Sequence, residues 1–192
     1  MTDDGGDVWG EAESLRELRV LSVDWLRGEV PNFPGYGGQP ASETHEIIDP
    51  LVELNESGLL TTSSQPARIG EGWRQRAYVE GFAAEIDARR IEIKALYSDL
   101  HILTFKSGTG GGYRTPVTVS EGEAMTWNGH ADHSWVVKRF EDRCSEAALD
   151  DLRSAWFVIA IDLRWGRKGH LWDVLLDGNV PAEAVETVQR GS

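Results

Sequence analysis

The 192-residue chain contains only one cysteine, Cys144, so it can form no internal disulfide and no zinc site made of several thiolates. It also lacks a run of about 18 apolar residues, the length that a bilayer-spanning helix needs. The first ten residues, MTDDGGDVWG, are acidic where a signal peptide is basic and then apolar. These absences predict a chain of the reducing cytoplasm that makes no contact with a membrane.

Basic residues are few: 19 Lys and Arg stand against 32 Asp and Glu, which gives a formal net charge of -13. The imbalance is concentrated in residues 1–60, which hold 13 acidic and three basic side chains. Such a charge repels nucleic acids and anionic membranes, so we expect neither as a partner. The acidic first third is instead a candidate docking surface for a basic protein.

The remaining composition is that of a folded protein, with 40% hydrophobic residues and eight tryptophans. The length suits one domain of ordinary size, with a hydrophobic core that needs no disulfide or metal. We therefore predict an acidic amino-terminal arm over residues 1–11 and a single globular domain over residues 12–192.

Hydrophobic periodicity and glycine or proline breaks predict alternating helices and strands. Helices are expected over residues 12–28, 42–58, 84–100, 145–155 and 168–178, and Pro50 should break or kink the second of these early. Strands are expected over 59–65, 76–83, 101–108, 116–122, 124–127, 134–140 and 156–163, with a polar connection over 66–73. This order predicts a mixed α/β or α+β single domain, whose central sheet is flanked by about four to five helices. Residues 156–163, apolar at seven of eight positions, should lie near the middle of that sheet.

Three phrases of the sequence, LNESGLLTTSSQP, QRAYVEGF and IDLRWGRKGHLW, follow an early tryptophan and helix between Trp9 and Leu26. With these phrases the chain resembles an uncharacterised family that is common in actinobacteria and their phages and is filed as a domain of unknown function. Lys168 stands where that family usually has asparagine. The resemblance covers most of the chain and implies a single domain, but no activity, cofactor or site residue.

The triplet Trp-Gly-Arg within the last phrase also names a DNA-binding module of some poly(ADP-ribose) polymerases. Such a module continues through a sheet well beyond the triplet. Only 25 residues follow Arg167 here, which is too few for that module. We therefore reject a DNA-binding interpretation of this motif.

Residues 58–82 carry more hydrogen-bonding groups than a core strand needs, and they form the central candidate site. The predicted ligand-binding residues are Ser63, Ser64, Gln65, Arg74 and Arg76. Arginine offers a planar fork that matches phosphate or carboxylate, and alternation along a strand places Arg74 and Arg76 on one face. We therefore predict a small anionic or nucleotide-like ligand. In the alternative, Arg76 pairs with Glu80 or another carboxylate, and Gln65 satisfies backbone groups beside Pro66.

Two carboxylates are candidates for acid/base catalysis, Glu80 in the central segment and Asp162 in the apolar run of residues 156–163. A buried carboxylate is costly unless it is paired, so Asp162 should either pair with Arg164 or Arg167 or act as a general base. The sequence does not separate turnover of the ligand from its capture. No dinucleotide or phosphate-loop fingerprint is present, so no cofactor is expected.

The segment NGHADHSW offers His130, Asp132 and His133, but the two histidines need a further ligand that nothing in the sequence marks, so no metal site is expected. The glycine-rich residues 107–116 are typical of a flexible hairpin connection rather than of an anion cradle. A second hypothesis belongs to another class. It describes an acidic protein–protein interaction module or inhibitor that has no small-molecule site and docks through its first third.

Overall fold

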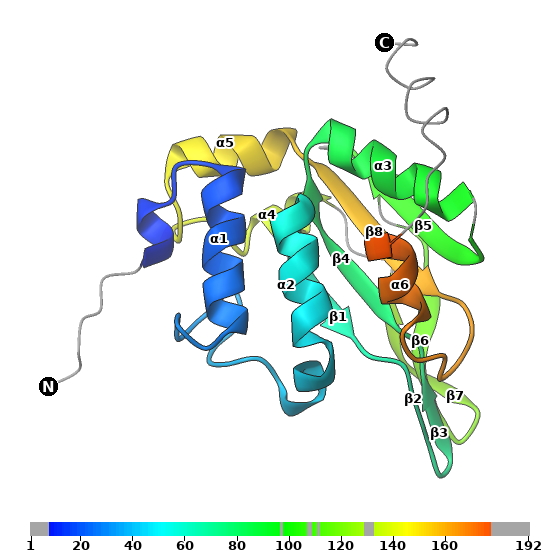
Figure 1. The fold of residues 1–192 in the computed structure, drawn as a ribbon. Coiled ribbons are helices and arrows are strands. Elements are labelled where there is room, and N and C mark those ends of the chain that lie inside the picture. The colour runs from blue at the N-terminus through cyan, green and yellow to red at the C-terminus, as the bar shows by residue number, and fades with distance from the viewer. Residues whose placement is uncertain (1–7, 97, 107–108, 111, 129–132, 178–192) are drawn as a thin grey trace, which may run out of the picture.

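A computed structural model describes residues 8–96, 98–106, 109–110, 112–128 and 133–177 of the chain. Within these ranges there are six α-helices, two 3-10 helices and two four-stranded antiparallel sheets (Figure 1). The fold is therefore a mixed α+β domain, which confirms the predicted class. It differs from the expectation in having a second sheet beside the central one.

The helices begin and end at residues whose side chains or backbone suit those positions. The α-helices are α1 (Leu15–Leu26), α2 (Ile48–Ser57), α3 (Glu85–Leu96), α4 (His133–Val137), α5 (Glu146–Ser154) and α6 (His170–Asp177), and the 3-10 helices are Val8–Glu11 and Ser42–Ile47. Ser14 and Ser145 cap α1 and α5, because their hydroxyls accept hydrogen bonds from the backbone N–H groups of Glu17 and Ala148. None of the helices in the described ranges is long and apolar enough to cross a membrane.

Pro50 shapes the second predicted helix as expected. Residues 42–58 divide into the 3-10 helix Ser42–Ile47 and α2, and Pro50 lies in the first turn of α2. A proline is tolerated there because the first N–H groups of a helix have no partner within it. Gly58 then ends α2 with a backbone φ of 126°, a conformation that favours glycine.

The first sheet contains the strands that carry most of the predicted site. Its strands are β1 (Leu59–Gln65), β4 (Tyr78–Ala83), β5 (Leu100–Phe105) and β8 (Trp156–Asp162), in the order β1-β4-β8-β5. The strands expected over residues 59–65 and 76–83 are present as β1 and β4 and pair antiparallel, and all seven residues of β8 are buried within the sheet. The strand, helix and strand expected in succession over residues 76–108 are β4, α3 and β5, and β8 lies between the two strands.

The second sheet was not predicted as a separate unit. It consists of β2 (Arg68–Gly70), β3 (Trp73–Gln75), β6 (Thr115–Ser120) and β7 (Glu123–Asn128), in the order β2-β3-β6-β7. The hairpin of β2 and β3 replaces the polar connection that was expected between β1 and β4. The expected strand over residues 134–140 was wrong, because that segment begins with α4. Val136, Val137 and Phe140 are buried together at helical spacing, so their burial overrides the strand preference of valine.

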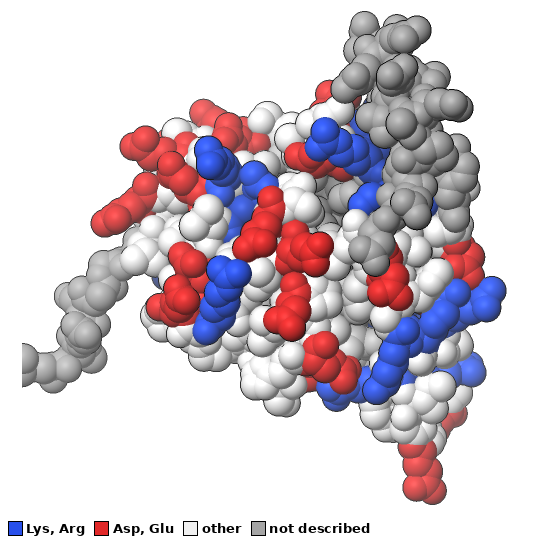
Figure 2. Space-filling model, viewed as in Figure 1, with Lys and Arg blue, Asp and Glu red and all other residues white. Residues whose placement is uncertain are grey.

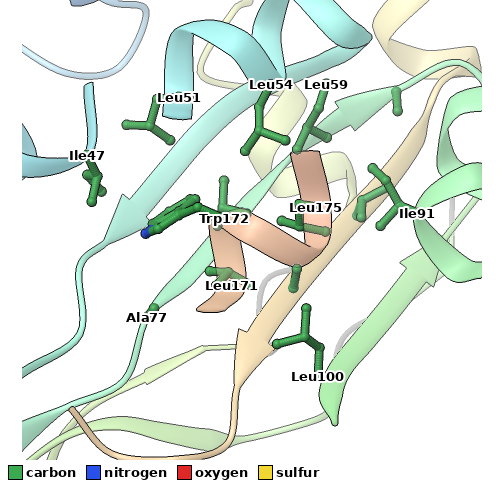
Figure 3. Packing of buried hydrophobic residues seen from close by; sticks show 14 of the residues in the cluster. Ile47, Leu51, Leu54, Leu59, Ala77, Ile91, Leu100, Leu171, Trp172 and Leu175 are labelled. Atoms are coloured by element: carbon green, nitrogen blue, oxygen red, sulfur yellow. The ribbon is translucent and has the colours of Figure 1, made fainter. Parts of the chain in front are cut away.

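Hydrophobic clusters cover both faces of the first sheet, and alternation along β8 assigns its side chains to one or the other. Val158 and Ala160 pack with residues of α2, α3 and α6, among which Trp172 lies centrally (Figure 3). Phe157 and Ile159 pack on the opposite face with residues of α1, α4 and α5. By the same alternation, Tyr78 and Glu80 of β4 face the second cluster, whereas Asp162 of β8 faces the first.

Candidate functional site

The structure divides the predicted Ser/Gln/Arg cluster into two places. Ser63 and Ser64 line a cleft beside β1. Arg74 and Arg76 instead lie over the ring of Trp165, with their guanidinium carbons 4.8 and 3.9 Å from its centroid. The predicted ligand-binding residues are therefore not gathered into one pocket.

Gln65 lies between these two places and has a structural role. Its Nε2 donates hydrogen bonds to the carbonyl oxygens of Arg76 and Val117, at 2.8 and 3.0 Å. Its Oε1 accepts a hydrogen bond from the Thr118 hydroxyl at 3.3 Å. Gln65 thus joins the end of β1 to β6. The alternative interpretation expected it to satisfy backbone groups beside Pro66, but the Pro66 carbonyl accepts its hydrogen bond from Gln75 instead.

The cleft beside β1, called here the β1 cleft, has a volume of about 350 Å³. Its walls combine four consecutive hydroxyl side chains of β1, four aromatic rings, one carboxylate and one guanidinium. These residues are Thr61, Thr62, Ser63, Ser64, Tyr78, Trp25, Phe33, Tyr36, Glu43 and Arg139, and further lining comes from Leu26, Pro34, Gly35, Ala41, Thr44 and Leu51. The register of β1 against β4 shifts between Thr61 and Ser63, and such an irregularity re-aims side chains out of strict alternation.

Tyr78 places a hydroxyl group in the wall of the β1 cleft. Its OH lies 3.0 Å from the Oγ of Ser63, so the two hydroxyls share a hydrogen bond. Burial raises the pKa of the Tyr78 phenol, although the hydrogen bond with Ser63 opposes this shift. The phenol therefore stays protonated at neutral pH and can donate a hydrogen bond.

Arg139 supplies the positive charge of the β1 cleft from a distant part of the sequence, directly after α4. A Cβ added to Gly35 would lie only 2.9 Å from the Cβ of Arg139, so the stem of Arg139 packs closely against this glycine. The Arg139 guanidinium also lies 4.7 Å from the centroid of the Trp135 ring. These contacts hold a cation at the wall of the cleft.

Glu80, the first predicted acid/base residue, is buried on the same face of the sheet as Tyr78. Its Oε2 accepts a hydrogen bond from the Nδ2 of Asn128 at 3.2 Å. Burial raises the pKa of the Glu80 carboxyl to about 7, while the charge of Arg139 and the hydrogen bond from Asn128 oppose the rise. Glu80 can therefore take up or release a proton near neutral pH, although it does not itself line the cleft.

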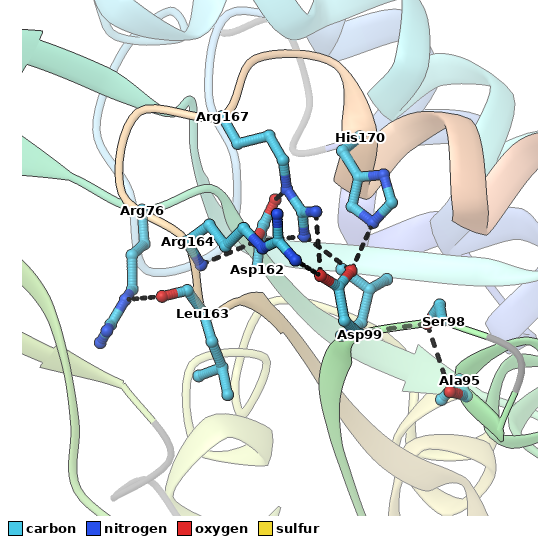
Figure 4. Close-up of polar contacts among 10 residues, drawn as sticks. Arg76, Ala95, Ser98, Asp99, Asp162, Leu163, Arg164, Arg167 and His170 are labelled. Carbon is cyan, nitrogen blue, oxygen red and sulfur yellow. Dashed lines mark hydrogen bonds and ion pairs between the residues drawn. The ribbon is translucent and has the colours of Figure 1, made fainter.

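Asp162, the second predicted acid/base residue, lies on the opposite face and is held by Arg167 and by a backbone N–H group (Figure 4). It accepts hydrogen bonds from the Nε and Nη2 of Arg167, at 2.6 and 2.7 Å, and from the backbone N–H of Arg164 at 2.9 Å. Arg167 also pairs with Asp99, which in turn contacts Nε2 of His170 at 2.8 Å. This network satisfies the buried carboxylate and favours the predicted pairing over a role as general base.

Arg76 is held by backbone carbonyls rather than by a carboxylate. Its Nε and Nη1 donate to the carbonyl oxygens of Leu163 and Pro116, at 2.9 and 2.7 Å. Burial and the nearby charge of Arg74 lower the pKa of the Arg76 guanidinium. Among the residues that the structure describes, neither Arg74 nor Arg76 forms an ion pair, so the expected pairing of Arg76 with Glu80 is not found.

Of the histidine segment, only His133 lies within the described residues. It is buried at the start of α4, and its Nε2 lies 3.0 Å from the carbonyl oxygen of Ala155. His130 and Asp132 lie outside the described residues, as do Ser107, Gly108 and Gly111 of the glycine-rich segment. In the part of the chain that is described, no group of three or more His, Cys, Asp or Glu side chains could hold a metal ion.

Three residues of these sites were missed from the sequence. Arg139 and Asn128 lie 59 and 48 positions beyond Glu80 in the chain, and no motif around them marks a site. Trp165 belongs to the late phrase of the resemblance, which assigned it no role. A single sequence could have drawn attention only to Trp165, as a large aromatic residue in a glycine-containing turn.

Comparison with known proteins gives partial matches to a class of enzymes. The chain is 24% identical to methylenetetrahydrofolate reductase 1 of Schizosaccharomyces pombe over 192 residues, which is 80% of this chain and 32% of the reductase. It is 32% identical to methylenetetrahydrofolate reductase (NADH) 1 of Zea mays over 134 residues, 60% of this chain and 22% of that enzyme. A probable methylenetetrahydrofolate reductase (NADH) of Oryza sativa subsp. japonica is 25% identical over 191 residues, 78% of this chain and 32% of that enzyme. The chain thus spans about a third or less of the length of these relatives.

A family model covers almost the whole chain. The model of the domain of unknown function DUF6919 matches residues 4–179, a stretch that includes every helix and strand described above. This match agrees with the resemblance drawn from the motifs of the sequence. The chain belongs to the DUF6919 family, a domain of unknown function.

Proposed function

We propose that the β1 cleft binds a small anionic, nucleotide-like molecule. The observation that carries this proposal is the combination of side chains in its wall: aromatic rings, a row of hydroxyls and the guanidinium of Arg139. Small-molecule sites are typically concave, apolar in most of their wall and fitted with a few convergent polar groups. A volume of about 350 Å³ suits a ligand of nucleoside size.

Each part of such a ligand has a matching group in the cleft. A heteroaromatic base can stack on Tyr36 or Trp25, whose rings are 5.9 Å apart and nearly perpendicular. Ribose hydroxyls can exchange hydrogen bonds with Ser64 and with the carboxylate of Glu43. A phosphate or carboxylate can accept hydrogen bonds from Arg139. The ligand-binding role predicted for Ser63 and Ser64 is thereby assigned to this cleft.

The reductases that match the chain support the same class of ligand. Two of their names include NADH, which is a dinucleotide, and all three include methylenetetrahydrofolate. Because the chain covers about a third or less of those enzymes, their reaction is not carried over to it. What is carried over is the expectation that a heteroaromatic, anionic molecule is recognised.

Turnover in the cleft would draw on Glu80, the buried carboxyl whose pKa of about 7 lies near physiological pH. Asp162 cannot act on a ligand in the cleft, because it faces the other side of the sheet and is paired with Arg167. A reaction would also need Glu80 to exchange protons with the cleft through Tyr78, whose side chain lies in the cleft wall. Binding without chemistry requires none of these steps and is the simpler form of the proposal.

The test is to incubate the purified chain with a nucleotide and metabolite extract, separate bound from free molecules, and identify both by mass spectrometry. We expect an anionic, nucleotide-like compound to be retained by the wild type and by the control Arg153→Gln, which removes an exposed arginine far from the cleft. Arg139→Gln should weaken retention at least tenfold, because a hydrogen bond to a charged group contributes about 1.5–3 kcal/mol. New compounds in the free fraction would establish turnover.

A second variant separates loss of binding from loss of fold. Ser64→Trp should fill the β1 cleft from its β1 wall, and its thermal unfolding is measured beside that of the wild type. Retention that survives both Ser64→Trp and Arg139→Gln would place the ligand elsewhere. Retention of nothing beyond a protein-free control would overturn the proposal.

The acidic interaction module remains a second candidate, because acidic side chains cover much of the surface above α1 and α2 (Figure 2). Glu17, Glu53 and Glu56 are exposed on these helices. If this surface docks on a basic protein, the double variant Glu53→Lys/Glu56→Lys should abolish capture of that partner and leave metabolite retention unchanged. The cleft proposal predicts that Arg139→Gln weakens metabolite retention and leaves capture of the partner unchanged.

A further inference from the structure

A second hollow lies at the hairpin of β2 and β3, well apart from the β1 cleft. It is an open groove of about 520 Å³, called here the Arg74 groove, and it shares no lining residue with the β1 cleft. Its lining residues are Ile69, Gly70, Gly72, Trp73, Arg74, Val119, Gly122 and Trp165. The wall is thus apolar apart from one guanidinium.

Trp165 is held firmly in this wall by the turn that follows β8. The backbone N–H of Gly166 donates to the carbonyl oxygen of Gln75 at 3.1 Å. The carbonyl of Leu163, on the other side of the tryptophan, accepts the hydrogen bond from Arg76. Asp162 and Arg167 tie both ends of the turn together (Figure 4). The indole therefore offers a surface that is ordered before any partner arrives.

Arg74 has hydrogen-bonding capacity that the fold does not use. Among the described residues, the Arg74 guanidinium forms no hydrogen bond or ion pair and contacts the ring of Trp165. Arg76 lies on the same ring, and the proximity of the two like charges is unfavourable. In a chain of net charge -13, two neighbouring arginines without an ion pair among the described residues are unusual. A carboxylate beside Arg74 would relieve their repulsion and could accept two hydrogen bonds from its guanidinium.

The apolar part of the groove is also uncovered. Ile69 is 71% exposed although it lies in a strand, and a Cβ added to Gly166 would lie 2.3 Å from its Cγ1. Ile69 therefore lies directly over the turn that carries Trp165. β2 is the terminal strand of the second sheet, so nothing in that sheet covers it from outside. Exposed apolar groups next to free cations are typical of a surface that receives another molecule.

We propose that the Arg74 groove is a docking site for an acidic peptide segment of a partner protein, with a carboxylate on Arg74 and an apolar side chain against Ile69 and Trp165. Complementary charge favours this occupant, because Lys and Arg gather on this part of the molecule (Figure 2). A free small anion would use Arg74 but leave Ile69 exposed. A nucleic acid carries a negative charge on every nucleotide, whereas the groove wall offers a single guanidinium, so the net charge of -13 would repel it far more strongly than a peptide that brings one carboxylate.

The test uses a displayed library of random 12-residue peptides selected against the immobilised full chain. We expect the wild type to enrich sequences with Asp or Glu next to a large apolar residue. Arg153→Glu, a charge reversal on exposed α5, should enrich the same sequences, whereas Arg74→Glu should bind a synthetic peptide of that sequence at least tenfold more weakly. Raising the salt concentration should weaken wild-type binding as well.

Two checks keep the outcome interpretable. Arg74→Gln, which removes the positive charge without introducing a negative one, replaces Arg74→Glu if the latter unfolds at a lower temperature than the wild type. Ile69→Ser should also weaken binding of the peptide. A site that takes only a small anion would not be affected by this substitution. The proposal would be overturned if the wild type enriched no sequences, or only sequences without acidic residues. It would also be overturned if Arg74→Glu enriched the same sequences as the wild type.

Discussion

Replacing Glu80 with glutamine should stabilise the protein at neutral and alkaline pH and leave its stability near pH 4.5 unchanged. Burial raises the pKa of the Glu80 carboxyl from 4.5 to about 7 in the folded chain. Between these two pH values the folded carboxyl keeps a proton that the unfolded chain has released. Because the unfolded state then binds fewer protons, the free energy of unfolding falls as the pH rises.

The size of this effect follows from the width of the pH window. Each pH unit within it lowers the free energy of unfolding by about 1.4 kcal/mol, so ionised Glu80 destabilises the fold by about 3 kcal/mol above pH 7. Glutamine keeps the side chain's length and an oxygen that can accept from Asn128, but it carries no charge. The variant should therefore gain about 3 kcal/mol over the wild type at pH 8.

The assay is urea unfolding of the wild type and Glu80→Gln at intervals from about pH 4.5 to 8.5. Subtracting one curve from the other cancels the titration of all other acidic groups. Glu53→Gln, at an exposed position of α2, is the matched control and should give a flat difference. A difference for Glu80→Gln that does not grow with pH, or a less stable variant at pH 8, would refute the reasoning.

Three further substitutions test the contacts around Asp162 and Trp165. Asp162→Asn should lower the free energy of unfolding by about 3 kcal/mol, because it leaves Arg167 without its buried partner. The midpoint of thermal unfolding should fall by about 6–12 °C, and a fall of under about 2 °C would contradict the assigned pairing. Arg76→Ala should cost about 2 kcal/mol in urea unfolding, since two carbonyl oxygens lose their donor, whereas Arg74→Ala should cost under about 1 kcal/mol. An equal loss of unfolding free energy in Arg76→Ala and Arg74→Ala would contradict the different roles given to the two arginines.

Most of the helices and strands could be predicted because their burial follows the periodicity of the sequence. β8 is an example: a nearly continuous apolar run can only be satisfied at the centre of a sheet. The hairpin of β2 and β3 escaped prediction because three-residue strands are too short to show any periodicity. A strand was wrongly predicted over residues 134–140 because Val136 and Val137 favour strands locally. Their burial with Phe140 depends on contacts with residues distant in sequence.

The candidate site could be predicted only in part, for a related reason. Glu80 and the serines of β1 were recognisable as polar groups in strands that should be apolar. Arg139 was not, since only the folded chain brings it to the cleft. The separation of Arg74 from the serines follows from the break between β3 and β4, which the assumption of one continuous strand concealed. A hydrogen-bonding role for Gln65 could be named in advance, because a buried amide must find partners.

The place of β8 between β4 and β5 has a consequence for how the chain is made. β8 is the last strand in the sequence among the described residues, yet both of its neighbours are synthesised long before it. Until residue 162 has left the ribosome, β4 and β5 each present an unpaired edge, and such edges recruit other chains. Products truncated before β8 should therefore aggregate, and the nascent chain should depend on chaperones until β8 has emerged.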